Sequence, residues 1–453
     1  MAPQKAHVVP GWRDRRQVLP AVAGSGAVTP GDSFTAVRCG WFADVVTGEV
    51  TRDVTLVLDG HRVADVLRDG RTPEGRVLDL SAHVVAPGLI DLHTHLTGEE
   101  ETGSYGDILM ESEADAALIG VHNARRTIDA GFTTVRDVGA FRAFTDVSLR
   151  KAIDKGWVVG PRMHCAGAYV TTTDGGGEVT GFSADVCVPD ALRFGVADSP
   201  HEVRRAVRRI MAHGADLIKV IATGAVLAPG TNPGAPEYAE DEIRAAVEEA
   251  SNYGAFVAAH AHGAEGIKRA TRAGVRSVEH GSFADDESLA LMAEHGTYLV
   301  ADVWAGDWME EEGTKKEWPA DTMKKIIDTT ETQRDAFRRA LAHGVRIGFG
   351  TDSGIYPHGM NVHQLAKHVE LGMSPMAALR SATLWASECL GNDEVGALIP
   401  GRHADLVAVE VDQDVRAAVG AGNLPGSASE VLGDLSRFAT HMSHVVKGGT
   451  LVR

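Results

Sequence analysis

The chain has 453 residues, and its 44 Lys and Arg against 62 Asp and Glu give a formal net charge of −18. This length predicts one large domain or two domains. The acidic balance argues against a nucleic acid or an anionic membrane as a partner, because both attract clustered Lys and Arg. Four cysteines without a CxxC pair argue against a disulfide framework and against a Cys-rich zinc site.

The N-terminal segment 1–33 is rich in Pro, Gly and Ala, and we expect it to be flexible. Charged residues at positions 13–16 interrupt the apolar stretch that an export signal would need. The chain contains no apolar run of about eighteen residues, the length that spans a bilayer. We therefore predict a cytoplasmic protein that takes a small-molecule substrate, contacts no membrane and forms a homo-oligomer.

Residues 34–87 and 392–453 have the same strand-like pattern, in which short segments alternate apolar and polar residues and end at Gly, Asp or Pro. We expect these two ends of the chain to pair into one small β-sandwich domain.

Between them, residues 88–391 alternate short apolar strands with amphipathic helices, which is typical of a parallel α/β architecture. Two of the helices are predicted over 201–214 and 240–254. Eight strands are predicted, at 88–95, 133–139, 162–170, 217–223, 256–262, 277–281, 298–302 and 346–352. This alternation predicts that residues 88–391 form a catalytic (β/α)8 barrel of the TIM type.

Several of these strands end in residue types that bind metals, whereas a strand buried on both faces should be apolar throughout. The first ends in His93 and His95, which share one face because side chains alternate along a strand. Later strands end in further polar residues, namely His260, His262, Glu279, His280 and Asp352. A His- and Asp-rich site at this end of a barrel favours Zn²⁺, or a neighbouring first-row ion such as Co, Mn or Fe.

Lys219 lies in the apolar fourth strand, where burial of an ammonium is costly. A Schiff-base lysine, a catalytic base and a lysine carboxylated by CO₂ are the three interpretations. The carboxylated form suits a pair of divalent cations best, because its negative charge offsets part of theirs while a free ammonium would be repelled. With a single metal, the Schiff-base interpretation gains weight.

Six segments follow one another in a recognisable order: PGLIDLHTHL (87–96), HGADLIKVIATG (213–224), AHAHG (259–263), SVEHGS (277–282), GFGTDSG (348–354) and IPGRHADLVAVEVD (399–412). Together they resemble the amidohydrolase superfamily of metal-dependent hydrolases. The resemblance covers residues 34–453 and is closest to the imidazolonepropionase-like and prolidase-like branch, which includes phenylurea and thiocarbamate hydrolases.

The resemblance implies a binuclear metal centre bridged by a carboxylated lysine. The residues implied are His93, His95 and Asp352 for the first metal, His260 and His280 for the second, and Lys219 for the bridge. It further implies hydrolysis of a C–N bond in an amide, peptide, carbamate or urea, by attack of a metal-bridging hydroxide. Asp352 would move the proton to the leaving nitrogen.

Contacts to the substrate are less clearly indicated. The resemblance implies that Tyr238 polarises the substrate carbonyl, and that His262 either lies near the same oxygen or hydrogen-bonds behind the ligands. Relatives carry a His in the Gly-rich stretch that corresponds to 171–181, where this chain has none. Arg193 is either a carboxylate clamp in its place or an ordinary exposed arginine.

Two loops are further candidates for substrate contacts. The insertion 304–318, which begins with Trp304, is either a lid over the substrate or a subunit contact. His358 lies in the loop after the eighth strand and is expected to face the pocket.

Three alternatives to C–N hydrolysis stay open on the same fold: a deaminase with a single metal, a lactonase or other ester-type hydrolase, and a non-catalytic scaffold.

Overall fold

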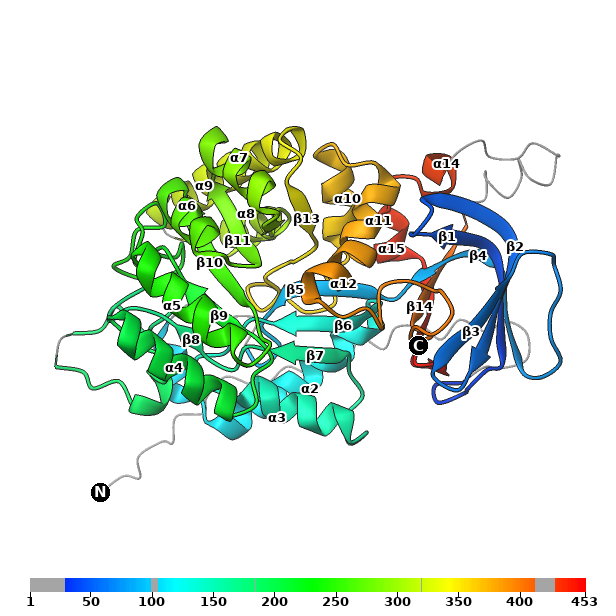
Figure 1. Ribbon diagram of the computed structural model, residues 1–453, viewed down its shortest axis with the longest axis horizontal. Coiled ribbons are helices and arrows are strands. Elements are labelled where there is room, and N and C mark those ends of the chain that lie inside the picture. The colour runs from blue at the N-terminus through cyan, green and yellow to red at the C-terminus, as the bar shows by residue number, and fades with distance from the viewer. Residues whose placement is uncertain (1–28, 99–104, 184, 319, 412–427) are drawn as a thin grey trace, which may run out of the picture.

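The computed structural model describes residues 29–98, 105–183, 185–318, 320–411 and 428–453. Residues 1–28 of the predicted flexible segment 1–33 lie outside the described residues. Figure 1 shows parallel strands surrounded by helices on one side of the molecule and the strands β1 to β4 on the other.

Strands from both ends of the chain form one seven-stranded sheet in the order β16-β15-β14-β4-β1-β2-β3. Their bounds are β1 (Ala36–Asp44), β2 (Glu49–Asp59), β3 (Arg62–Leu67), β4 (Val77–Pro87), β14 (Leu406–Glu410), β15 (Met442–Lys447) and β16 (Thr450–Leu451). The two ends meet where β14 pairs antiparallel with β4, with Leu406 opposite Pro87. Among the described residues these strands belong to a single sheet, so the second layer of the predicted sandwich is not shown.

The central part of the chain forms parallel strands in two sheets, β5-β6-β7 and β13-β12-β11-β10-β9-β8. Their bounds are β5 (Leu89–Thr94), β6 (Phe132–Asp137), β7 (Arg162–Cys165), β8 (Tyr169–Val170), β9 (Ile218–Ile221), β10 (Val257–Gly263), β11 (Ser277–Phe283), β12 (Tyr298–Val300) and β13 (Arg346–Gly348). Each of the eight predicted segments contains a strand. The α/β class is therefore confirmed, while the domain boundaries at residues 33, 87 and 391 stay a prediction.

The two parallel sheets touch along two lines. Thr94 of β5 forms a parallel bridge with Ser353, and the amide of Leu92 donates to the carbonyl of Phe349 at 2.8 Å. On the other side, the third predicted strand is divided in two, because β7 pairs with β6 whereas β8 pairs with β9. The strand ends that carry the polar residues are thereby gathered at one edge.

Helices pack around the parallel strands and bury apolar residues against them, whereas α14 and α15 contact the seven-stranded sheet. In α4, for example, Val203, Val207 and Ile210 are buried while Glu202 and Arg205 are exposed. The helices are α1 (Tyr105–Met110), α2 (Glu113–Asp129), α3 (Thr145–Asp154), η1 (Asp190–Leu192), α4 (Pro200–Ala212), α5 (Glu240–Ser251), α6 (Ala264–Ala273), α7 (Asp286–His295), α8 (Ala305–Lys315), α9 (Ala320–Ala342), α10 (His363–Glu370), α11 (Pro375–Ser381), α12 (Leu384–Leu390), α14 (Ala428–Leu432) and α15 (Ser436–Thr440). Among these described helices, none combines the length and apolarity needed to cross a lipid bilayer.

Leu56 lies in the core of the seven-stranded sheet, where its side chain is 0% exposed. Leu56→Ala should lower the free energy of unfolding by about 2–5 kcal/mol, because it leaves a cavity as well as removing buried apolar surface. Leu118→Ala is the control, since Leu118 on α2 is 69% exposed and its loss should cost less than about 0.5 kcal/mol. Urea titration followed by circular dichroism measures both, and equal stability of the two variants would contradict the core assignment.

Candidate metal centre

The polar residues at the strand ends face one cavity of about 280 Å³. They come from the ends of β5, β9, β10 and β11 and from the segment after β13. The residues from the predicted site that line the cavity are His93, His95, Lys219, His260, His262, His280 and Asp352. All but His95 are buried, so the cavity is a place where polar groups are largely removed from bulk water.

The first group of potential ligands is His93, His95 and Asp352, whose donor atoms lie within 4.8 Å of one another. Oδ1 of Asp352 is 3.3 Å from Nε2 of His93 and 3.2 Å from Nε2 of His95. Asp352 has a φ of 57°, a left-handed conformation that is costly for a residue with a side chain. Its amide donates to the carbonyl of His93 at 2.8 Å, which helps to hold this conformation.

Both histidines of this group are oriented through their other ring nitrogen. Nδ1 of His93 is 2.9 Å from Oε2 of Glu279, and Nδ1 of His95 is 2.8 Å from the carbonyl oxygen of Gly139. Because both partners can only accept, each Nδ1 carries the proton. Nε2 of each ring is therefore left as the atom that faces Asp352 and the cavity.

Glu279 is itself held by a buried network behind the cavity. Arg136 is 0% exposed and donates to Oε1 of Glu279 at 2.8 Å, and its other nitrogens donate to Ser277 and to the carbonyl of Leu92. Although burial alone would raise it, the pKa of Glu279 lies well below its ordinary value because of the Arg136 charge and the His93 hydrogen bond. The buried charge is thus paired rather than isolated.

Asp91 ties the first strand to the segment that carries Asp352. Its Oδ1 accepts the amides of His93 and Thr351, both at 3.1 Å, and its Oδ2 accepts the Thr351 hydroxyl at 2.6 Å and the Asn361 amide at 2.9 Å. Burial raises the pKa of Asp91 to about 6, against the effect of these donors. Four donors on one carboxylate fix the spacing between the two parts of the first ligand group.

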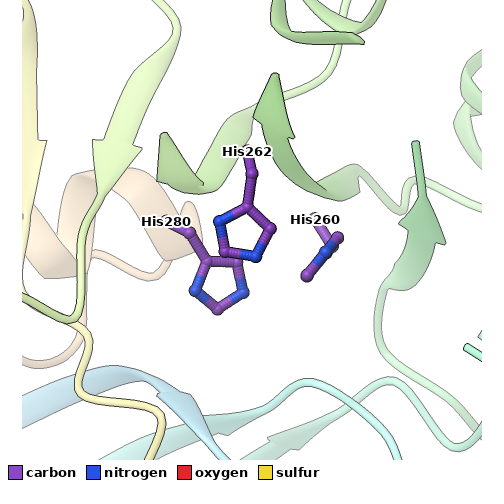
Figure 2. Close-up of side chains that lie close together, drawn as sticks. All are labelled: His260, His262 and His280. Atoms are coloured by element: carbon purple, nitrogen blue, oxygen red, sulfur yellow. The ribbon is translucent and has the colours of Figure 1, made fainter. Parts of the chain in front are cut away.

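The second group consists of His260 and His262 on β10 and His280 on β11, whose rings gather around one point in Figure 2. Ring centroids are 4.6 Å apart for His260 with His262 and for His260 with His280, and 4.7 Å apart for His262 with His280. Burial lowers the pKa of His260 well below its ordinary value and that of His262 to about 3. The imidazoles of His260 and His262 therefore favour the neutral form, which is the form that binds metals.

Asp302, at the end of the β12 segment, was not predicted as a site residue. Its Oδ1 is 2.9 Å from Nδ1 of His280 and accepts from Nε2 of Gln333 on α9 at 2.7 Å. The donor atoms of Asp302, His280 and Asp352 also lie within 4.8 Å of one another. The signal in the sequence was its place, since Asp302 is the last residue of a predicted strand, as Asp352 is.

Lys219 on β9 lies among these groups with 2% exposure. Its Nζ has no hydrogen-bond partner among the described residues. Burial lowers the pKa of Lys219 to about 8, while the charges of Glu279 and Asp352 oppose that shift. Three donors without an acceptor are unfavourable in a buried site, so the surroundings suit an altered lysine or a further bound group better than a free ammonium.

Comparison with known proteins agrees with this geometry. The model of the amidohydrolase family matches residues 84–452. The chain belongs to the amidohydrolase family. The matched region contains every strand that carries a potential ligand named above. Membership of the family confirms the predicted reaction class, metal-dependent hydrolysis of a C–N bond.

Individual relatives point to the same branch of the amidohydrolases. Ochratoxinase from Aspergillus niger is 32% identical over 390 residues, which cover 80% of this chain and 78% of that protein. The crystal structure of a Xaa-Pro dipeptidase with bound methionine in the active site is 34% identical with a TM-score of 0.81, and covers 92% of this chain and 99% of that one. Imidazolonepropionase from Cutibacterium acnes is 27% identical over 79% of this chain and 84% of its own length.

Two of the predicted substrate contacts are not brought into the amidohydrolase cavity. The hydroxyl of Tyr238 donates to the carbonyl of Ala197 at 2.7 Å, and this buried side chain is not among the residues that line the cavity. Arg193 forms an ion pair with the buried carboxylate of Glu178, at the end of the Gly-rich stretch. That pairing gives Arg193 a structural partner in place of a ligand.

The other two predicted contacts also lie outside the lining of the cavity. His358 is fully buried, with Nδ1 3.2 Å from the Thr127 hydroxyl and Nε2 3.3 Å from the carbonyl of His95, so it supports the loop that carries a ligand. Trp304 stacks on His363 with the ring centroids 5.2 Å apart. The insertion 304–318 does reach the cavity through α8, which contributes Gly306 and Met309.

Asp302→Asn should lower the affinity for divalent metal by about 10–100-fold, because His280 loses the charged acceptor that orients its ring. The asparagine keeps an oxygen of similar position, so the fold should be retained. Asp328→Asn is the matched control, since Asp328 on α9 is exposed and pairs with Lys324. Competition against a chromogenic chelator measures the affinities, and equal values for both variants would argue against a positioning role of Asp302.

Proposed function

We propose that this amidohydrolase has a binuclear metal centre and cleaves an amide or peptide C–N bond, with carbamates and ureas as related alternatives. The observation that carries the proposal is the convergence of seven predicted residues on one cavity. The names of the relatives, an ochratoxinase and a Xaa-Pro dipeptidase, support cleavage of an amide or peptide.

The donor set fits divalent transition metals, because it combines neutral imidazoles with carboxylates. Zn²⁺ is favoured over Co, Mn or Fe. The residues proposed to hold the ions are His93, His95 and Asp352 for the first, His260 and His280 for the second, and carboxylated Lys219 between them. When bound, the ions supply a water that ionises near neutral pH and polarise the substrate carbonyl.

Carboxylation of Lys219 is supported by its unpartnered Nζ. A carbamate replaces three buried donors by an anion, and this anion suits a site that is to hold two cations. The low pKa of the buried amine also favours its neutral form, which is the form that reacts with CO₂.

Asp352 is proposed to move the proton. Its carboxylate is buried, and its Oδ1 lies between His93 and His95 at the floor of the cavity. It takes the proton of the attacking water and delivers it to the leaving nitrogen as the C–N bond breaks.

His262 is proposed to contact the substrate carbonyl. Its Nδ1 is 2.8 Å from the Ser282 hydroxyl, and with Ser282 as the donor the proton of this neutral ring lies on Nε2. An N–H donor aimed into the cavity can stabilise the oxyanion that develops on the substrate. The role predicted for Tyr238 stays a prediction, since its hydroxyl donates to Ala197.

Closure of the two parallel sheets into a (β/α)8 barrel, with a β-sandwich from the chain ends, remains our proposal for the complete fold. Two observations support the closure. Thr94 forms a bridge with Ser353, and β7 and β8, which lie in one predicted strand segment, pair with different sheets. The cytoplasmic location and the homo-oligomer stay predictions.

Lys219→Ala should lower the bound metal below two ions per chain and reduce turnover at least about 1,000-fold, because the bridge and the charge balance are both lost. Lys151→Ala, on the exposed face of α3, is the control and should bind and turn over as the wild type does. Elemental analysis and amide hydrolysis are measured on the same samples. Full activity of Lys219→Ala would contradict the bridging role.

Removal of metal by a chelator should abolish turnover and lower the melting temperature, because bound ions stabilise only the folded chain. Titration with Zn²⁺ should restore activity at two ions per chain. Saturation at one ion would favour the single-metal deaminase, and activity against lactones or aryl esters without amide hydrolysis would favour the ester-type alternative.

A further inference from the structure

Arg142 lines the same cavity as the proposed metal ligands. It lies in the loop between β6 and α3, three residues after Gly139, whose carbonyl orients His95. Three residues of chain span at most about 10 Å, so the loop that positions a metal ligand also carries this guanidinium.

Among the described residues, the guanidinium is held at one end by a carbonyl and pairs with no carboxylate. One terminal nitrogen donates to the carbonyl of Ile108 at 2.9 Å. Within the part of the chain that the structure describes, its Nε is buried without a hydrogen-bond partner, and its side-chain hydrogen bond goes to the Ile108 carbonyl rather than to a carboxylate. A planar guanidinium has five donors, so several are left to bind a ligand.

The surroundings of Arg142 suit a ligand that carries a carboxylate next to an apolar side chain. Ile108, Phe141 and Ala116 line the wall beside it, and Leu227 and Met309 line the cavity as well. The other lining acid outside the metal groups, Glu111, is already engaged in an interaction. Asp115 feels the Arg142 charge, but its carboxylate caps α2 by accepting from Ser112.

We infer that Arg142 binds the carboxylate of the substrate, so that the enzyme acts on N-acyl amino acids or dipeptides with an apolar side chain in preference to neutral amides. The inference rests on the proposed function and deepens it by naming the substrate class. Two-point pairing of the guanidinium with a carboxylate anchors one end of the substrate while the amide lies at the metal ligands. Arg142 thereby takes the carboxylate-binding role considered above for Arg193, whose guanidinium pairs with Glu178 and does not line the cavity.

The test uses two probes that differ only in the carboxylate, N-acetylphenylalanine and N-acetylphenethylamine, with the metal-loaded full-length enzyme. The wild type should prefer the acid in kcat/KM. Arg142→Gln keeps a donor for Ile108 but removes the charge. This variant should reduce kcat/KM for N-acetylphenylalanine on the order of 100-fold. It should change kcat/KM for N-acetylphenethylamine by less than about threefold, so that the preference for the acid is lost.

Two further variants separate recognition from folding. Arg142→Lys keeps the positive charge but lacks the paired donors of a guanidinium, so it should recover part of the preference for the acid. Arg125→Gln is the matched control, because Arg125 is exposed on α2 and pairs with Asp129 of the same helix. Both should melt as the wild type does, and Arg125→Gln should keep the full preference.

The outcomes are distinct. Equal wild-type kcat/KM for the two probes, or an equal loss on both in Arg142→Gln, would overturn the role of Arg142 and leave the amide hydrolase proposal standing. Absence of turnover of either probe by the wild type with two bound ions would overturn the amide substrate class itself, and the inference with it.

Discussion

The candidate metal centre depends on two buried carboxylates that hydrogen-bond to histidines of the site and are themselves held by further side chains. Glu279 holds the outer nitrogen of His93 and is held by Arg136, while Asp302 holds the outer nitrogen of His280 and is held by Gln333. An unpaired charge in this position would be costly. Because each carboxylate is hydrogen-bonded on both sides, the imidazoles of His93 and His280 are held in one tautomer and one direction without an ion.

Hydrogen bonds from buried carboxylates also explain how strained backbone conformations persist at the site. His280 and Asp352 both have positive φ, at 69° and 57°. Such conformations persist only where surrounding contacts over-determine them, and here Asp91 and the Asp302 network supply those contacts. Binding energy for the ions is therefore not spent on ordering the chain, which is the general advantage of a preorganised site.

Much of this could be predicted from the sequence. The alternation of strands and helices gave the α/β class, and the period of two along a strand placed His93 and His95 on one side. The strand ends predicted where the ligands meet, because parallel strands bring their carboxyl ends to one edge. Pairing between distant residues could not be predicted. Nothing in the local sequence marks Arg136 as the partner of Glu279, or Gln333 as the partner of Asp302.

The substrate contacts were harder to predict for the same reason. The resemblance implied a substrate contact for Tyr238, and Arg193 was either a carboxylate clamp or an ordinary exposed arginine. In the structure the hydroxyl of Tyr238 donates to the carbonyl of Ala197, and Arg193 pairs with Glu178. Arg142 carried no motif, and only the shape of the cavity draws attention to it. Loops between strands follow no simple period, so their side chains are placed by tertiary contacts.

The seven-stranded sheet has a consequence for synthesis of the protein. β4 leads into β5 through Gly88 alone, and its partner on one side is β14, more than three hundred residues later. During translation β4 therefore leaves the ribosome with one edge unpaired, and that edge stays unpaired until β14 emerges. Pairing of this edge of β4 is therefore completed late in synthesis, whereas the residues that orient His93 and His95, namely Glu279 and Gly139, are made earlier.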